Sequence, residues 1–178
     1  KNLPEDFYDY RKDISFTNAH LNYLRLENKK PIMYGLATDD SHHYHKSGSE
    51  WSNAGRGWVM VQSDSLSAVS LIEALEAGQF YSSTGATLKS LKHENNRLSI
   101  EVAEEEGINY SITFIGLRKG KSETEEFVTV KGTMADFEIT EDIVFVRSRI
   151  TSSKLQSNPI ENILYEMAWT QPVLRYEQ

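Results

Sequence analysis

The segment GLATDDSHHYH, residues 35–45, concentrates side chains that can bind a divalent metal ion. It contains two carboxylates and three of the five histidines of the chain: Asp39, Asp40, His42, His43 and His45. In an extended segment, the side chains of Asp40 and His42 point the same way and lie about 7 Å apart along the chain. A carboxylate oxygen and an imidazole nitrogen can then converge on one Zn, Mn or Fe ion, or on two adjacent ions. Asp39, His43 and His45 project differently, and we expect them to orient the two ligands.

A solvated surface loop is the alternative interpretation of this cluster. Asp-x-His is a common tripeptide, and surface loops often carry both residue types. A catalytic zinc site also needs about three protein ligands and a water, so two ligands do not complete it. The two remaining histidines, His20 and His93, fit ordinary surface or packing roles better than metal ligation.

Two other residues are candidates for binding the anionic part of a substrate. Arg56, in AGRGW, carries a planar guanidinium that matches carboxylate and phosphate groups. Ser83, in YSSTG, offers a hydroxyl beside a flexible glycine. The alternatives are a solvated arginine and a serine that bonds the backbone where a strand ends.

Composition excludes several classes of site. The chain of 178 residues has no cysteine, which removes disulfides, zinc sites with thiolate ligands and cysteine nucleophiles. Its formal net charge of −7 argues against a nucleic-acid partner, because such proteins usually present a basic face. No apolar run reaches the roughly 18 residues needed to cross a bilayer. Localisation stays open.

Before residue 86, the pattern is that of an α/β fold. Residues 31–38, PIMYGLAT, are typical of a short, buried parallel strand, and residues 57–63 and 79–85 of two further extended segments. The clearest helix is predicted for residues 65–78, where Leu66, Val69, Ile72 and Leu75 recur at helical spacing. Either Ser65 or Ser67 can cap its start, and Gly78 suits its C-terminal end. An earlier helix is predicted from the N-cap Thr17 to Asn28.

After residue 86, the pattern changes to short strands rich in β-branched residues. The predicted strands are RLSIEVA, YSITFIG, EFVTV, ADFEIT, DIVFVRSRIT and a possible last one around MAWTQPV. Turn formers separate them: Asn95, Asn96, Gly107, Gly120 and Gly132. This spacing predicts an antiparallel sandwich or small barrel, and we expect a β-sandwich. The predicted division is therefore an α/β part, residues 1–86, and a β-sandwich domain, residues 87–178.

MYGLATDDSHHYH, GRGWVMV and LIEALEAGQFYSSTG, in this order, resemble the last part of a PHP domain. PHP denotes the polymerase and histidinol phosphatase superfamily of metal-dependent hydrolases. The sequence is most similar to its carbaryl-hydrolase-like and predicted metal-dependent phosphoesterase branch. FVRSRITSS and AWTQPV resemble the end of that branch's C-terminal β domain, so the resemblance extends from about residue 18 to residue 173.

The resemblance implies an irregular (β/α)7 barrel with metal ions at its C-terminal mouth. The family's ligands come from an early His-x-His, from His and Glu residues in the middle of the domain, and from a final Asp-x-His. Asp40-Ser41-His42 matches only the last of these motifs. The resemblance thus implies that this chain, which begins Lys-Asn-Leu-Pro, is the C-terminal part of a longer enzyme, and that its missing N-terminal part is its partner.

The function implied is that of a metal-dependent hydrolase acting on a small-molecule ester, with a phosphoester as the expected substrate. Asp40 would bind a metal and take a proton from water, and His42 would bind a metal or stabilise the attacked oxygen. A carbamate or carboxylic ester hydrolase of the same family is one alternative. A non-catalytic β-sandwich binding module is another, which an exposed row of aromatic side chains on one sheet face would favour. The aromatic residues of the predicted strands fit core packing better: Tyr110, Phe114, Phe127, Phe137 and Phe145.

Overall fold

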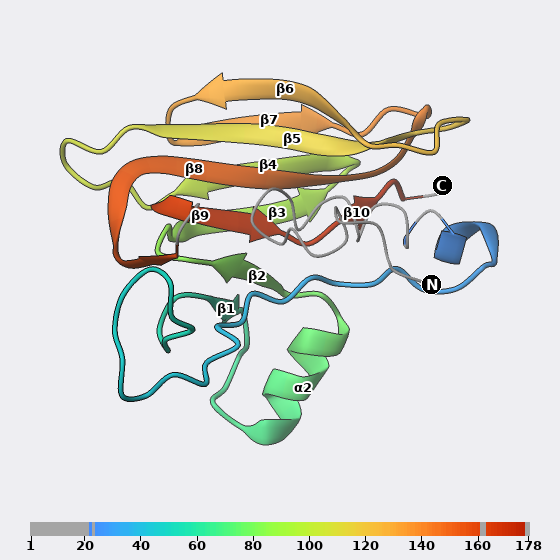
Figure 1. The fold of residues 1–178 in the computed structure, drawn as a ribbon. Helices are drawn as coiled ribbons and strands as arrows, with labels where there is room; N and C mark the ends of the chain where they lie inside the picture. The colour runs from blue at the N-terminus through green and yellow to red at the C-terminus, as the bar shows by residue number, and fades with distance from the viewer. Residues whose placement is uncertain (1–21, 23, 161–162, 177–178) are drawn as a thin grey trace.

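The structure is a computed structural model that describes residues 22, 24–160 and 163–176. Figure 1 shows its strands and its labelled helix, α2 (Ala68–Glu76). The strands are β1 (Trp58–Val61), β2 (Phe80–Ser83), β3 (Leu88–Glu94), β4 (Arg97–Val102), β5 (Tyr110–Arg118), β6 (Glu125–Lys131), β7 (Met134–Glu138), β8 (Ile143–Ile160), β9 (Ile163–Thr170) and β10 (Val173–Leu174).

The strands form two antiparallel sheets. The larger sheet has seven strands, in the order β1-β2-β9-β8-β5-β6, with β10 paired to β8. The smaller sheet has the order β3-β4-β7. Side chains of both sheets share one hydrophobic core, so they form a sandwich. The expected antiparallel β-sandwich is therefore confirmed, but its larger sheet also includes β1 and β2, which lie before residue 86.

The core between the sheets follows from the alternation of side chains along each strand. Leu98 and Ile100 of β4 face Ile112 and Phe114 of β5, and all four are almost completely buried. The ring of Phe137 stacks on those of Phe114 and Phe127, at centroid distances of 5.0 and 5.2 Å. Tyr110 and Phe145 are buried as well. Core packing is thus confirmed for these aromatic residues, and they form no exposed row.

Local sequence signals place the turns and the helix correctly. Asn95 and Asn96 both have positive φ, 51° and 56°, as a two-residue hairpin between β3 and β4 requires. Ser67 is the N-cap of α2, and its hydroxyl accepts a hydrogen bond from the Ser70 N–H at 3.2 Å. Gly78 has φ +71° just beyond the C-cap, where a left-handed residue ends many helices.

The earlier helix is described only in part. Residues 22 and 24–27 are helical, and Asn28 lies in a turn, as predicted. The proposed N-cap, Thr17, lies outside the described residues. The buried side chain of Asn22 makes two hydrogen bonds to the backbone of Met33. It accepts from the Met33 N–H at 2.6 Å and donates to the Met33 carbonyl at 3.0 Å.

The strand predicted for residues 31–38 is wrong, because this segment pairs with no other strand. Side chains satisfy its backbone instead. The Gln171 amide bonds both the N–H and the carbonyl of Gly35, at 2.8 and 2.9 Å. The Ser82 hydroxyl accepts from the Ala37 N–H and donates to the Gly35 carbonyl, at 3.0 Å each. The segment is therefore held against the larger sheet without joining it.

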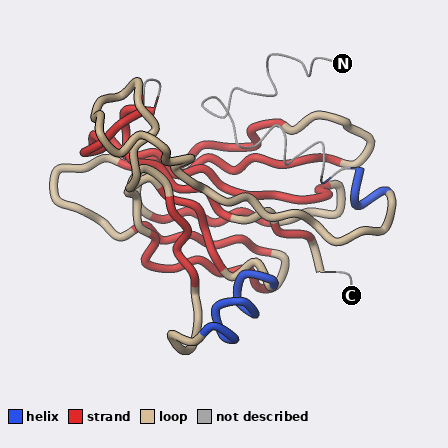
Figure 2. The backbone as a smooth tube through the Cα atoms, turned by 60° about the horizontal axis from the view of Figure 1, so that its bottom comes forward, coloured by secondary structure: helices blue, strands red, loops and turns tan. Residues whose placement is uncertain are grey.

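Strands β1 and β2 also differ from the parallel arrangement expected of a barrel. They pair antiparallel, and β2 continues the larger sheet by pairing with β9. Every strand pairing in the described residues is antiparallel. Figure 2 shows α2 standing beside these strands at the margin of the sandwich.

Part of the apolar surface of α2 is exposed, while Leu71 and Leu75 are half-buried. Leu66, just before the helix, is 96% exposed, Val69 66% and Ile72 55%. The buried residue of the helix is Ala74. Of the predicted stripe, Leu66 lies before the helix and Leu75 is half-buried, so Val69 and Ile72 are the helical residues of the stripe that stay exposed. Among the described residues, no helix is long and apolar enough to span a membrane.

We expect Ile150→Val to destabilise the fold by about 0.5–1.5 kcal/mol, because it removes one methylene from a fully buried position of β8. Val128→Ala removes two carbons from β6, but 42% of that side chain is exposed, so we expect a cost below about 0.5 kcal/mol. Urea unfolding of both variants measures the difference. An equal or larger loss for Val128→Ala would contradict the placement of the core.

Candidate metal centre

Asp39 closes the loop that carries the His and Asp cluster. Its carboxylate accepts hydrogen bonds from three consecutive backbone N–H groups, those of Gly55, Arg56 and Gly57, at 2.7, 2.6 and 2.6 Å. A carboxylate bound by several N–H groups is strongly held in place. Asp39 therefore joins the start of the loop to its end, directly before β1.

Arg56 fastens the same loop to the larger sheet. Its side chain is buried, with 5% exposed, and its guanidinium donates to the carbonyls of Gly48, Trp51 and Asn158 and to the Asn158 side chain. Asn158 lies on β8. Since its donors are directed to these acceptors, we assign Arg56 a structural role in this loop and do not place it in a substrate site.

Asp40 and His42 are exposed, and a backbone carbonyl determines which nitrogen of the neutral His42 imidazole carries the proton. Asp40 has a left-handed backbone, with φ 46°. The His42 Nδ1 lies 2.6 Å from the Asp40 carbonyl oxygen. Because a carbonyl only accepts, Nδ1 must carry the proton, and in the neutral ring Nε2 then keeps its lone pair. This is the arrangement found around metal-binding histidines, whose second nitrogen donates to a carbonyl or carboxylate.

His43 and His45 differ from His42. The His43 Nδ1 accepts a hydrogen bond from the Ser52 N–H at 3.3 Å, so in the neutral ring its proton lies on Nε2. The His43 ring packs between those of His42 and Trp51, with centroid distances of 4.3 and 4.9 Å. The His43 ring is therefore in contact with the ring of His42. His45 is exposed.

Ser83 lies away from solvent. It is buried in β2, and its hydroxyl donates to the Ala86 carbonyl at 2.7 Å and accepts from the Gly85 N–H at 2.9 Å. These bonds fit the alternative of a serine that satisfies the backbone at a strand end. We therefore place no substrate contact at Ser83.

The two candidate ligands do not form a complete site by themselves. In the part of the chain that the structure describes, no three His, Asp or Glu side chains come together in a group that could hold a metal ion. Asp40 and His42 fit the chemistry of a carboxylate and an imidazole ligand, since both are exposed and the hydrogen bond at Nδ1 leaves the lone pair of the neutral His42 ring on Nε2. A closed coordination sphere needs further ligands.

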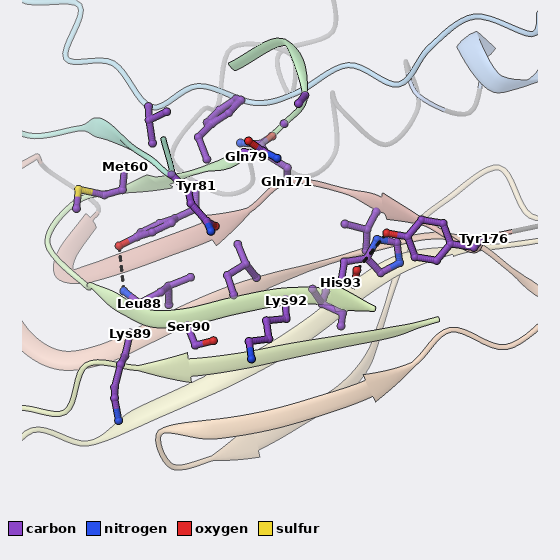
Figure 3. A pocket seen from close by; sticks show the side chains of 18 residues that line it. Met60, Gln79, Tyr81, Leu88, Lys89, Ser90, Lys92, His93, Gln171 and Tyr176 are labelled. Carbon is purple, nitrogen blue, oxygen red and sulfur yellow. Dashed lines mark hydrogen bonds between the residues drawn. The ribbon is translucent and has the colours of Figure 1, made fainter. Parts of the chain in front are cut away.

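A groove that the sequence did not predict lies at the margin of the sandwich. It has a volume of about 650 Å³, and it lies between β3 on one side and β1, β2 and the end of α2 on the other. Figure 3 shows Tyr81 reaching across to Leu88 and His93 stacked against Tyr176 at the far end. His93 and Tyr176 are far apart in sequence, so no local motif could have indicated that they meet.

Comparison with protein-family models, with curated proteins and with solved structures gives no match for this chain.

We expect Asp39→Asn to open the loop, because an amide nitrogen cannot accept the hydrogen bonds that one carboxylate oxygen receives. Unsatisfied N–H groups should lower the local stability by about 1–3 kcal/mol. Hydrogen exchange measured by NMR should then be faster at the amides of Gly55, Arg56 and Gly57. Asp40→Asn is the matched control, because asparagine tolerates a left-handed backbone. Unchanged exchange in Asp39→Asn, or equal acceleration in both variants, would contradict this role.

Proposed function

We propose that Asp40 and His42 are two of the ligands of a divalent metal ion in a PHP-type metallohydrolase, and that this chain forms the C-terminal part of that enzyme. The observation that carries the proposal is the hydrogen bond from His42 Nδ1 to the Asp40 carbonyl. It leaves Nε2 as a free lone pair on an exposed ring, two residues from an exposed carboxylate.

The charges of the loop support a cation at this place. Asp39 and Asp40 are adjacent carboxylates, which repel each other when both are ionised. Backbone N–H groups stabilise the charge of Asp39. The Asp40 carboxylate points to solvent, and a divalent ion bound to it would offset the remaining repulsion.

The remaining ligands would come from the N-terminal part of the same protein, and we propose that the apolar face of α2 packs against that part. Val69 and Ile72 lie more than half exposed on the helix, and Leu66 just before it. Trp58 and Met60 of the edge strand β1 are each 38% exposed. Exposed apolar surface next to an unpaired strand edge is typical of an interface.

The proposed reaction is hydrolysis of a small-molecule ester, with a phosphoester as the first candidate. A divalent ion at such a site lowers the pKa of a bound water towards 7 and polarises the scissile ester. Asp40 would hold the ion through its carboxylate and could accept the proton that the water loses. His42 would bind through Nε2, while the Asp40 carbonyl fixes its ring and the His43 ring packs beside it.

We expect Zn²⁺ added to the purified chain to bind weakly, because two ligands are available, and to shift the ring signals of His42 in NMR spectra. His42→Ala should weaken this binding at least tenfold. Removing a residue that only hydrogen-bonds a metal ligand already costs about 10–100-fold in affinity, and His42 would be a ligand itself. Asp40→Ala should weaken it similarly.

His45→Ala is the matched control, since His45 lies in the same loop and is also exposed. It should leave the affinity within about threefold of the parent. Zn²⁺ binding that is unchanged in His42→Ala, or lost equally in His45→Ala, would contradict the assignment of the ligands.

We expect replacement of the exposed apolar residues of α2 to leave the fold of this chain intact. Val69→Gln and Ile72→Gln should each change the free energy of unfolding by less than about 0.5 kcal/mol and should reduce binding of a hydrophobic dye. Ala74→Gln, on the buried side, should cost more than about 1 kcal/mol because it overpacks the contact with the sheet. Urea unfolding distinguishes them, and a large loss in either exposed variant would show that this face is already covered.

A further inference from the structure

Strand β3 presents an open edge to the groove. It is the outermost strand of the smaller sheet, and it pairs only with β4 in the described residues. The two-residue turn makes Glu94 and Arg97 a hydrogen-bonded pair, after which hydrogen-bonded and non-hydrogen-bonded pairs alternate. Leu91 and His93 therefore belong to non-hydrogen-bonded pairs, and their N–H and carbonyl groups point away from β4, towards the groove.

Two tyrosine hydroxyls cap the ends of this edge. Tyr81 of β2 accepts a hydrogen bond from the Leu88 N–H at 3.0 Å. Tyr176 donates to the His93 carbonyl at 3.1 Å, and its ring stacks on the His93 ring at 4.4 Å. The Tyr176 bond also confirms that the His93 carbonyl points outward. Between the two tyrosines, the N–H and carbonyl of Leu91 and the N–H of His93 have no hydrogen-bond partner among the described residues, so a ligand could bond them.

The groove beside this edge has the size and lining of a binding site. Its volume of about 650 Å³ lies within the roughly 300–1,000 Å³ of known ligand pockets. Apolar side chains form its inner wall: Tyr81, Leu88, Leu91, Leu98 and Val173. Burial raises the pKa of Tyr81, so its hydroxyl keeps a proton that it can donate. Burial lowers the pKa of His93, which keeps the stacked ring neutral.

Two lysines lie on β3 beside the groove, and Lys92 is the one whose charge is not paired with a described residue, while the exposed Glu94 ends the same strand. Figure 3 shows Lys89 and Lys92 on the side of β3 that faces away from Tyr81. Lys89 is paired with Glu101 at 2.7 Å. Lys92 is exposed and has no ion pair with a described residue. None of the described residues that line the groove is acidic.

From these features, we propose that the groove binds a short, extended peptide segment that adds a strand to the smaller sheet beside β3. Its backbone would bond the N–H and carbonyl of Leu91, as in other cases of strand addition to a sheet edge. Because side chains alternate along a strand, apolar residues of the peptide would face Tyr81 and Leu91. Acidic residues would lie on the outer face, within reach of Lys92.

This site is separate from the proposed metal ligands, and it does not depend on the proposed hydrolase activity. The loop of Asp40 and His42 contributes no residue to the lining of the groove. Loss of peptide binding would therefore leave the metal assignment unaffected, and the reverse also holds.

The probe is a blocked pentapeptide of alternating glutamate and valine, titrated into the ¹⁵N-labelled chain. The backbone amides of Leu91 and His93 should show the largest shifts, and that of Leu91 should exchange more slowly with solvent. A peptide with N-methylated valines cannot donate its inward hydrogen bonds, so it should bind at least tenfold more weakly. Lys92→Glu should weaken binding of the unmodified peptide about threefold to tenfold. Lys131→Glu changes the charge by the same amount at an exposed residue of β6, the edge of the larger sheet opposite β1, and should leave it within twofold.

Several results would overturn the proposal. Shifts confined to residues outside the groove, or equal binding of the N-methylated peptide, would show that no strand is added. An unchanged affinity in Lys92→Glu would exclude the proposed charge pairing. Protection of the Leu91 amide that increases with protein concentration, without peptide, would instead identify a second copy of the chain as the occupant.

Discussion

The pairing of strand β8 with its neighbours is the interaction on which the rest of the structure depends. β8 pairs with β5 along one edge and with β9 and β10 along the other, so it joins most of the larger sheet. Its buried residues Val146 and Ile150 contribute to the core shared with the smaller sheet. Its far end supplies Asn158, the anchor of Arg56. The same strand therefore organises both the sandwich and the loop of the candidate metal centre.

The loop shows how a polar segment is held without a core of its own. Arg56 connects it to β8, Asp39 ties its first residues to its last, and the Asp40 carbonyl fixes the ring of His42. Asp39, Arg56 and the Asp40 carbonyl are thus used to position other groups of the loop. In the loop, the Asp40 carboxylate, His42 Nε2 and the His45 ring are exposed, and of these two histidines it is His42 whose ring is fixed by a hydrogen bond with a described residue. This contrast is the physical reason for separating the candidate ligands from the residues that support them.

Much of the fold could be predicted from the sequence, because its signals are local. Asn95-Asn96, Ser67 and Gly78 each satisfy a backbone requirement that depends on neighbouring residues alone. The strand predicted at residues 31–38 failed because Ser82 and Gln171, distant in sequence, satisfy its backbone. Arg56 and Ser83 could not be separated from substrate-binding residues for the same reason. Their partners, Asn158 and the turn at Ala86, are defined only by the fold. The helix α2 was predicted, but its apolar residues do not share one environment: Leu75 is half-buried while Val69 and Ile72 are exposed, which the pattern alone could not show.

The most direct test of the central claim is the protonation state of the His42 ring. A long-range ¹H–¹⁵N correlation spectrum of the purified chain, recorded where the imidazoles are neutral, distinguishes the two tautomers, and His42→Ala assigns the signals. The hydrogen bond to the Asp40 carbonyl predicts a proton on Nδ1 and an unprotonated Nε2, the nitrogen that would bind a metal ion. A proton on Nε2 would mean that the hydrogen bond to the Asp40 carbonyl does not form, and His42 would then not be preorganised as a ligand.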